Sequence, residues 1–108
     1  MVSLMERYQH KIKTAEELRA IIGPPPRPKR VIMCHGVFDV VHPGHVRHLL
    51  YAKSKADVLV ASITADKHIT KGVHRPHVTQ DLRAVNLAAF EMVDDLGFAA
   101  IYRRLHAG

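Results

Sequence analysis

Residues 30–64 read RVIMCHGVFDVVHPGHVRHLLYAKSKADVLVASIT, and this stretch decides the fold. Its first apolar run, at residues 31–35, is short and rich in β-branched side chains, which predicts a buried strand. A second run of the same character at residues 57–64 predicts another strand. Between them, residues 43–55 carry a proline in the first turn and apolar side chains at helical spacing, so they predict a helix. Two buried strands joined by a helix indicate a right-handed βαβ unit with parallel strands.

The sequence before this unit predicts a separate lead-in. Residues 14–22 favour a short helix, because Thr14 and Glu17 have the spacing of a capping box. The proline-rich segment that follows cannot continue a helix. We therefore expect residues 1–30 to form an N-terminal helix and linker, and residues 31–108 to form the main domain.

The sequence after the unit repeats the alternation of helix and strand. Residues 80–93 return to helical spacing, and the apolar run at 96–102 predicts a third, short strand. The pattern indicates the α/β class, with a Rossmann-like open parallel sheet and flanking helices. Because only about half of such a sheet is present, we expect the domain to be truncated at its C-terminal end.

Composition limits the classes of function. A chain of 108 residues that is 47% hydrophobic has the size of one domain. It has neither a membrane-spanning apolar run nor a signal peptide, and its single cysteine suits a reducing compartment, so we expect a cytoplasmic protein that binds no membrane. The net charge of +6 favours anionic partners. Because the basic residues are scattered and aromatics are few, a phosphorylated small molecule is favoured over nucleic acid.

The loop after the first predicted strand has the features of a phosphate site. In open α/β sheets, ligands bind beyond the carboxyl ends of the strands. Gly36 allows close backbone approach there, and a helix that begins near Pro43 would direct unpaired N–H groups and its positive dipole end to the same place. His42 precedes that helix, His45 lies in its first turn, and Gly44 between them leaves space for a ligand. The sequence thus predicts a phosphate cradle flanked by two histidines.

Such a cradle suits nucleotidyl transfer, in which a phosphate oxygen attacks the α-phosphate of a nucleotide and expels pyrophosphate. That reaction depends on alignment and on stabilising charge, more than on a protein nucleophile. The two histidines could instead share a metal ion or serve only the loop structure. No acidic or thiol ligand lies nearby at a recognised zinc spacing, so we expect no protein-bound metal.

Two motifs carry a resemblance to a known family. Residues 36–53, GVFDVVHPGHVRHLLYAK, resemble the signature of the cytidylyltransferase-like nucleotidyltransferases, with GxFD at 36–39 and HxGH at 42–45. Residues 70–94, TKGVHRPHVTQDLRAVNLAAFEMVD, resemble the KG..RP....DR...L.....VD stretch of the D-glycero-β-D-manno-heptose 1-phosphate adenylyltransferase branch. The similarity extends from about residue 11 to residue 94. Family members continue with a serine- and threonine-rich element that also holds the triphosphate, and this chain ends before such an element.

The resemblance implies an enzyme that transfers a nucleotidyl group from ATP or CTP, accompanied by Mg²⁺, to a sugar phosphate or polyol phosphate. ATP is preferred, because the second motif resembles the adenylyltransferase branch. A homodimer is possible, since related folds commonly pair. The alternative is a noncatalytic or fragmentary domain of the same fold that binds a nucleotide or a partner.

The resemblance also assigns roles to residues. His42, His45 and Lys71 would bind the phosphates and stabilise the transition state. The expected nucleotide-contacting positions are His35, Gly36, Val37, Phe38, Asp39, Gly44 and Arg83. Asp39 could instead orient the loop, and Arg83 would approach the phosphates from the helix at 80–93. Asp66 and Arg75 are candidates for contacting the acceptor, although Asp66 could instead cap the following turn and Arg75 could be solvated.

Overall fold

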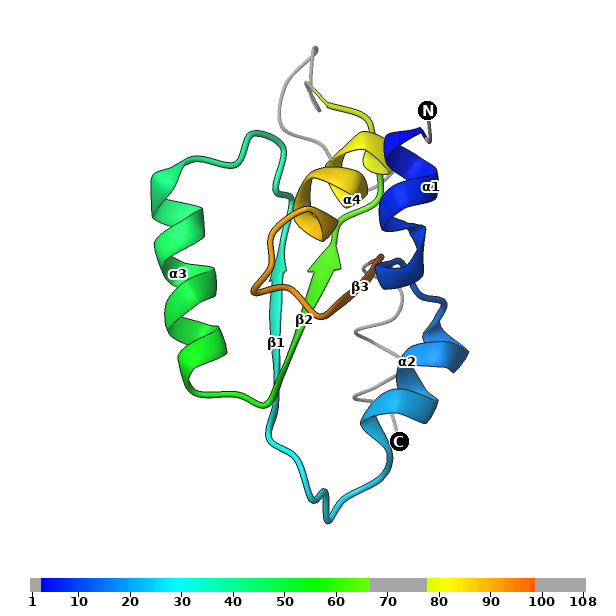
Figure 1. Cartoon of the computed structure of the whole chain (residues 1–108), viewed down its shortest axis with the longest axis vertical. Helices are drawn as coiled ribbons and strands as arrows, with labels where there is room; N and C mark the ends of the chain where they lie inside the picture. The colour runs from blue at the N-terminus through cyan, green and yellow to red at the C-terminus, as the bar shows by residue number, and fades with distance from the viewer. Residues whose placement is uncertain (1–2, 67–77, 99–108) are drawn as a thin grey trace.

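The computed structural model describes residues 3–66 and 78–98 (Figure 1). The elements in chain order are α1 Leu4–Tyr8, the 3₁₀ helix η1 Gln9–Lys11, α2 Ala15–Ile22, β1 Val31–Gly36, α3 Pro43–Ser54, β2 Val58–Ile63, α4 Gln80–Ala88 and β3 Asp95–Phe98. The predicted βαβ unit is confirmed, with each boundary within one residue of its expected place. The capping box of α2 is present as well: Thr14 and Glu17 exchange hydrogen bonds between side chain and backbone.

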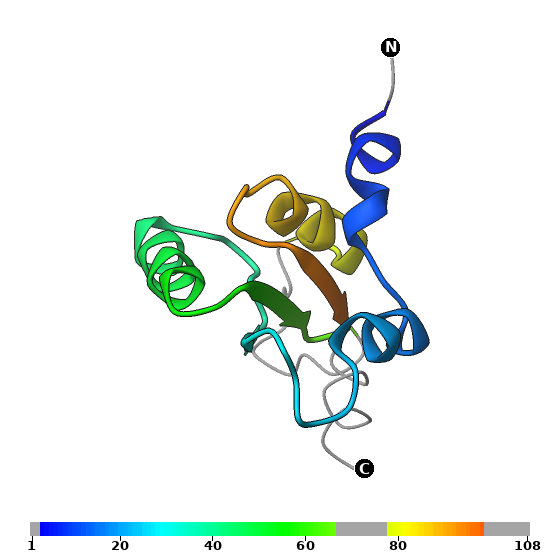
Figure 2. The ribbon, with the colours of Figure 1, turned by 60° about the horizontal axis from the view of Figure 1, so that its bottom comes forward.

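The three strands form one parallel sheet in the order β1-β2-β3. The predicted open parallel sheet with flanking helices is therefore confirmed. Alternation along each strand sends neighbouring side chains to opposite faces. In β2, Leu59 and Ala61 enter the core beneath α3 and α4, whereas Val60 meets Leu18 of α2 on the other face. Figure 2 shows α2 separated from α3 and α4 by the sheet.

The last predicted helix is shorter than expected, and the last strand begins one residue early. Helix α4 ends at Ala88, because the chain turns there and brings the N–H of Asp94 to the carbonyl of Leu59 at 3.0 Å. This turn places Asp95 beside Val60 at the start of β3. Of the predicted strand at 96–102, residues 99–102 lie outside the described part of the chain.

The N-terminal segment packs on the outer edge of β3. Ile12 forms a parallel bridge with Leu96, and the N–H of Lys13 donates to the carbonyl of Leu96 at 2.8 Å. The ammonium group of Lys11 donates to the carbonyl of Phe90 at 3.1 Å. The edge of β3 is thus covered by the lead-in, while no strand among residues 3–66 and 78–98 pairs with the outer edge of β1. The division of the chain at residue 30 stays a prediction.

Both crossover helices begin near the carboxyl ends of the strands. In Figure 1, β1 and β2 point toward the end of the molecule where α3 starts. The N-terminus of α4 lies at the same end, because Gln80 bonds to Asp66 shortly after β2. This edge therefore gathers the loop after each strand and the first turn of each helix. None of the helices in the described ranges is long and apolar enough to span a membrane.

Candidate functional site

His42 and His45 form a reciprocal pair at the start of α3. His42 is the N-cap residue in an extended conformation, and its Nδ1 accepts a hydrogen bond from the N–H of Gly44 at 3.0 Å. In return, Nδ1 of His45 accepts from the N–H of His42 at 3.1 Å. The two ring centroids lie 4.0 Å apart. Each imidazole is thereby held by a backbone donor that belongs to the motif itself.

These hydrogen bonds fix the tautomer of both rings. An imidazole nitrogen that accepts a backbone N–H carries no proton, so the proton of the neutral ring lies on Nε2. His42 and His45 thus each retain an Nε2–H donor, at the ring position farthest from the backbone. Burial lowers the pKa of His45, and the nearby His42 and His48 lower it further. His45 is therefore a neutral hydrogen-bond donor at neutral pH.

The expected free amides at the helix N-terminus are not found. Pro43 has no N–H, and the N–H of Gly44 is bonded to the His42 side chain. The N–H groups of His45 and Val46 both donate to the carbonyl of His42, at 2.9 and 3.2 Å. The interpretation of this helix end as a set of unpaired amides was wrong for these residues. The donors available to an anion here are the two imidazoles.

Gly44 serves a different purpose from the one expected. A Cβ atom at this position would lie 2.7 Å from Cε1 and 3.0 Å from Nδ1 of His42. The first distance is shorter than real Cβ contacts and the second is tight, so the space beside Gly44 is taken by the His42 ring. Glycine is needed here to let that ring cap the helix.

The loop after β1 has a strained turn that packs into the core. Phe38 has a φ of 51°, which is uncommon for a bulky residue, and only 7% of it is exposed. A Cβ atom on Gly36 would lie 3.2 Å from Cε2 of Phe38. Gly36 therefore accommodates the Phe38 ring, whose centroid lies 5.9 Å from that of His45. The buried side chain of Phe38 thus packs next to the ring of His45.

His35 and Ser62 lie side by side near the ends of β1 and β2. They are register partners, and Nδ1 of His35 is 3.0 Å from Oγ of Ser62. Ser62 is buried, whereas His35 is exposed. Sequence reasoning missed Ser62, although aligning the two predicted strands in parallel would have placed it opposite His35.

Two aspartates of the site are bound to the segment that leads into α4. Asp39 is 7% exposed, and its Oδ1 accepts from the N–H of Val78 at 2.8 Å. Oδ2 of Asp66 accepts from the N–H of Gln80 at 3.1 Å, and the Gln80 side chain accepts from the N–H of Asp66. Asp66 therefore bonds to the first residue of α4, whereas the turn directly after Asp66 lies outside the described residues, so both roles considered for it stay predictions. Sequence reasoning also missed Gln80, for which no motif gave a signal.

Arg83 is fully buried in α4. Its guanidinium group donates to the carbonyls of Val37 and Thr64, each at 2.7 Å, and to that of Val78 at 3.0 Å. It also forms an ion pair with Asp66 at 2.6 Å. The resemblance places this side chain on the phosphates, whereas the structure directs it toward the protein interior. Lys71 and Arg75 lie outside the described residues, so their assignments stay predictions.

Cys34 does not have the surroundings of a nucleophile. It is buried in β1, and this burial raises the pKa of its thiol. Its Sγ lies 3.9 Å from Nε2 of His48, a contact between a thiol and a ring of α3. The described residues also contain no group of three or more side chains that could hold a metal ion.

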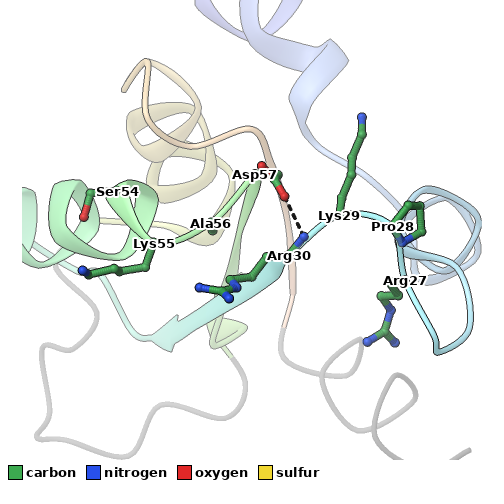
Figure 3. A pocket seen from close by; sticks show the side chains of 8 residues that line it. All are labelled: Arg27, Pro28, Lys29, Arg30, Ser54, Lys55, Ala56 and Asp57. Atoms are coloured by element: carbon green, nitrogen blue, oxygen red, sulfur yellow. Dashed lines mark hydrogen bonds between the residues drawn. The ribbon is translucent and has the colours of Figure 1, made fainter.

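An open recess of about 630 Å³ lies at the opposite edge of the sheet, by the amino ends of β1 and β2 (Figure 3). Its lining residues are Arg27, Pro28, Lys29, Arg30, Ser54, Lys55, Ala56 and Asp57. Figure 3 shows Lys29 and Arg27 pointing away from Arg30 and Lys55, so the four cations do not converge on one point. The carboxylate of Asp57 accepts from the N–H of Arg30 at 2.8 Å. This recess is remote from the histidine pair and is a weaker candidate for the site.

Comparisons with known proteins identify a matching family model and several similar proteins. Residues 33–103 match the model of the cytidylyltransferase-like family. The chain is 37% identical to the bifunctional protein HldE of Campylobacter concisus, over 81% of this chain and 19% of that protein. It is 39% identical to HldE of Sulfurimonas denitrificans, over 86% of this chain and 22% of that protein. The chain thus spans about a fifth of the length of these curated relatives.

A solved structure shares the fold. It is the lipopolysaccharide core biosynthesis protein from Thermoplasma volcanium, with a TM-score of 0.57 and 25% sequence identity. The match covers 66% of this chain and 58% of that one. The likeness therefore includes most of the present chain and a little over half of its neighbour.

Proposed function

This chain belongs to the cytidylyltransferase-like family, as predicted from its motifs, and from that premise we propose that it acts in nucleotidyl transfer. The donor is ATP or CTP, and the acceptor is a phosphorylated sugar or polyol. A phosphate oxygen of the acceptor attacks the α-phosphorus of the nucleotide. The bond from that phosphorus to the bridging oxygen breaks, and the electron pair leaves with pyrophosphate.

The observation that carries the proposal is the pair of backbone hydrogen bonds accepted by His42 and His45, from which their tautomers follow. Because Nδ1 of His42 and of His45 both accept backbone N–H groups, each neutral ring offers Nε2–H as a donor. These two donors are already oriented before the substrate binds. They can therefore stabilise the negative charge that develops on the phosphate oxygens, and the protein does not have to reorganise first. Removal of one such donor typically lowers the rate by 10²–10³-fold, or about 2.7–4 kcal/mol.

Magnesium enters this proposal as part of the nucleotide substrate. Both carboxylate oxygens of Asp66 are already bonded, to Gln80 and to Arg83, and Asp39 accepts from Val78. Phosphate oxygens and water are ligands that Mg²⁺ prefers, and it is seldom held by an all-protein cage. The ion would neutralise phosphate charge, while His42 and His45, with Lys71 as a proposed third group, bind and orient the triphosphate.

The identity of the substrates is the finer part of the proposal. Similarity to HldE proteins, together with the KG..RP motif, favours ATP and a sugar phosphate of the heptose 1-phosphate type. CTP with a polyol phosphate is the alternative within the same chemistry. The charge of +6 agrees with either anionic pair.

A second candidate function is a nucleotide-binding domain without turnover. It is favoured by Arg83 and Asp66, whose charged groups bind each other and the protein backbone in this structure. Binding of nucleotide without release of pyrophosphate would distinguish this candidate from the enzyme.

The deciding experiment measures pyrophosphate release with ATP or CTP, Mg²⁺ and a panel of phosphorylated acceptors, beside nucleotide affinity measured by calorimetry. We expect release with one nucleotide and one class of acceptor, and its loss in the variant His42→Ala. Nucleotide binding without release for any acceptor would leave the binding domain as the function. Absence of both binding and release would contradict both candidates.

A further inference from the structure

The side chain of Arg83 connects three backbone segments at the carboxyl edge of the sheet. Its two acceptors at 2.7 Å, the carbonyls of Val37 and Thr64, follow β1 and β2. The third acceptor is the carbonyl of Val78, which precedes α4. One side chain therefore fixes the loop after each of the two strands relative to the helix.

Burial decides what this guanidinium can do. Arg83 has no exposed surface, so in this structure its guanidinium group contacts protein atoms and not solvent. A buried charge destabilises the protein unless it is paired and hydrogen-bonded. Arg83 meets both conditions, with Asp66 as its counter-ion and three carbonyls as acceptors.

The loop held by Arg83 leads directly to the histidine pair. Val37 precedes Phe38, whose φ of 51° has to be stabilised by its surroundings. Asp39 follows and accepts from the N–H of Val78, so the loop is bonded to the α4 segment a second time. Only Val40 and Val41 then separate this anchored turn from His42. A change in the anchor would move the ring that caps α3.

We propose that Arg83 is a positioning residue, which holds the loop at residues 37–41 so that His42 and His45 present their Nε2–H groups in one fixed arrangement. The inference rests on the proposed function only for the use of those groups. Arginine suits this role because its planar fork donates in several directions at once, whereas the lysine ammonium is a point charge on a flexible stem. Lysine at this position could not maintain bonds to three carbonyls and a carboxylate together.

The first test reads the histidines directly and requires no substrate. In the unaltered protein, the ¹⁵N signals of both rings should show Nδ1 unprotonated and Nε2 protonated above the histidine pKa. We expect Arg83→Lys to shift the His42 signals and to bring Nδ1 and Nε2 toward equal protonation. The control Val85→Ala removes buried methyl groups from the same helix without touching the hydrogen-bonded network, and its signals should match those of the unaltered protein.

The second test separates positioning from direct phosphate binding. A lysine can still attract phosphate as a point charge, so a phosphate ligand would lose less affinity in Arg83→Lys than in Arg83→Met. Positioning predicts equal losses of ATP affinity in the two variants, each about tenfold, or about 1.4 kcal/mol. Affinity is measured under conditions in which circular dichroism shows that each variant is folded. If Arg83 only stabilised the fold, its replacement would lower the folded fraction and leave the ATP affinity of the folded molecules unchanged.

A further variant keeps the inference testable should the Arg83 variants fail to fold. Asp66→Asn retains the shape of the side chain and removes the counter-ion of the guanidinium. We expect the same displacement of the His42 signals in this variant. Unshifted signals in Asp66→Asn and in folded Arg83→Lys would overturn the proposal. Shifted signals in a protein that releases no pyrophosphate would preserve it and contradict only the proposed enzyme.

Discussion

His42 and His45 orient each other: the N–H of His42 donates to Nδ1 of His45 at 3.1 Å, and the two rings lie 4.0 Å apart. The two nitrogens of the His45 ring therefore have separate tasks. Its Nδ1 accepts a backbone N–H at the start of α3, and its Nε2–H is the donor that the proposed function assigns to the phosphates. Amide side chains can separate these tasks, because each one resembles only one edge of an imidazole.

The variant His45→Asn should keep the cap and lose the donor. The asparagine oxygen can replace Nδ1 as acceptor for the N–H of His42, but no group replaces Nε2–H. We expect pyrophosphate release to fall by about 100-fold or more, with the free energy of unfolding within about 0.5 kcal/mol of the unaltered protein. The control His45→Gln places an amide N–H near the Nε2 position, so it should retain more activity than His45→Asn. Equal activities in the two variants would contradict the assignment of Nε2.

Substitution of Gly44 by alanine should damage the site more than the fold. The new Cβ atom would lie 2.7 Å from Cε1 of His42, so the imidazole has to leave its position and its bond to the N–H of Gly44. Alanine also favours the helix by about 1 kcal/mol relative to glycine, which offsets the lost cap. We expect at least a tenfold loss of nucleotide affinity and a urea midpoint close to that of the unaltered protein. Unchanged affinity would show that the His42 ring position does not matter for binding.

The pH dependence of stability should carry a contribution from His45. Burial first, and then His42 and His48, lower the pKa of His45 below its ordinary value of 6.5. Between the folded and unfolded pKa values the unfolded chain binds more protons, so stability rises with pH across that window. The contribution is complete above pH 6.5 and is lost as the pH falls through the folded pKa. Urea unfolding at several pH values should show this slope, and the slope should be smaller in His45→Asn.

The ion pair at the far edge of the sheet should contribute to stability and not to activity. Oδ2 of Asp94 accepts from the N–H of Leu59 at 2.7 Å and from Lys53 at 2.8 Å. Asp94→Ala leaves that N–H without its acceptor, which should lower the free energy of unfolding by about 1–3 kcal/mol. The matched change Lys53→Ala removes a partly exposed charge partner of Asp94 and an exposed hydrogen bond to the carbonyl of Asp57, and should cost about 0–1 kcal/mol. A larger loss in Lys53→Ala than in Asp94→Ala, measured by urea unfolding, would contradict this ranking.

Local sequence patterns were sufficient to predict those parts of the fold that depend on residues close together in the chain. The two apolar runs and the intervening helix gave the βαβ unit, and the spacing of Thr14 and Glu17 gave the cap of α2. The histidine pair could be placed at a helix N-terminus, because Pro43 marks the first turn. Which imidazole atoms face the backbone did not follow from the motif, since that depends on the conformation of the turn.

The role of Arg83 could not be read from the sequence. Its partners Val37 and Thr64 lie 46 and 19 residues away along the chain. A lone arginine on a helix is equally consistent with a solvated charge, a ligand contact or a buried side chain that hydrogen-bonds to several backbone segments. The same reasoning applies to the end of α4, which depends on where Asp94 must meet Leu59 in the sheet.

His42 caps a helix with one nitrogen and is exposed to solvent, so under the proposed function natural selection on folding and on ligand binding would act on a single ring. A gene copy that no longer served any substrate would still be under pressure to keep this imidazole, or to acquire serine, aspartate or asparagine in its place. Replacement by one of these three in a homologue would thus mark a lineage that has abandoned the chemistry while preserving the scaffold.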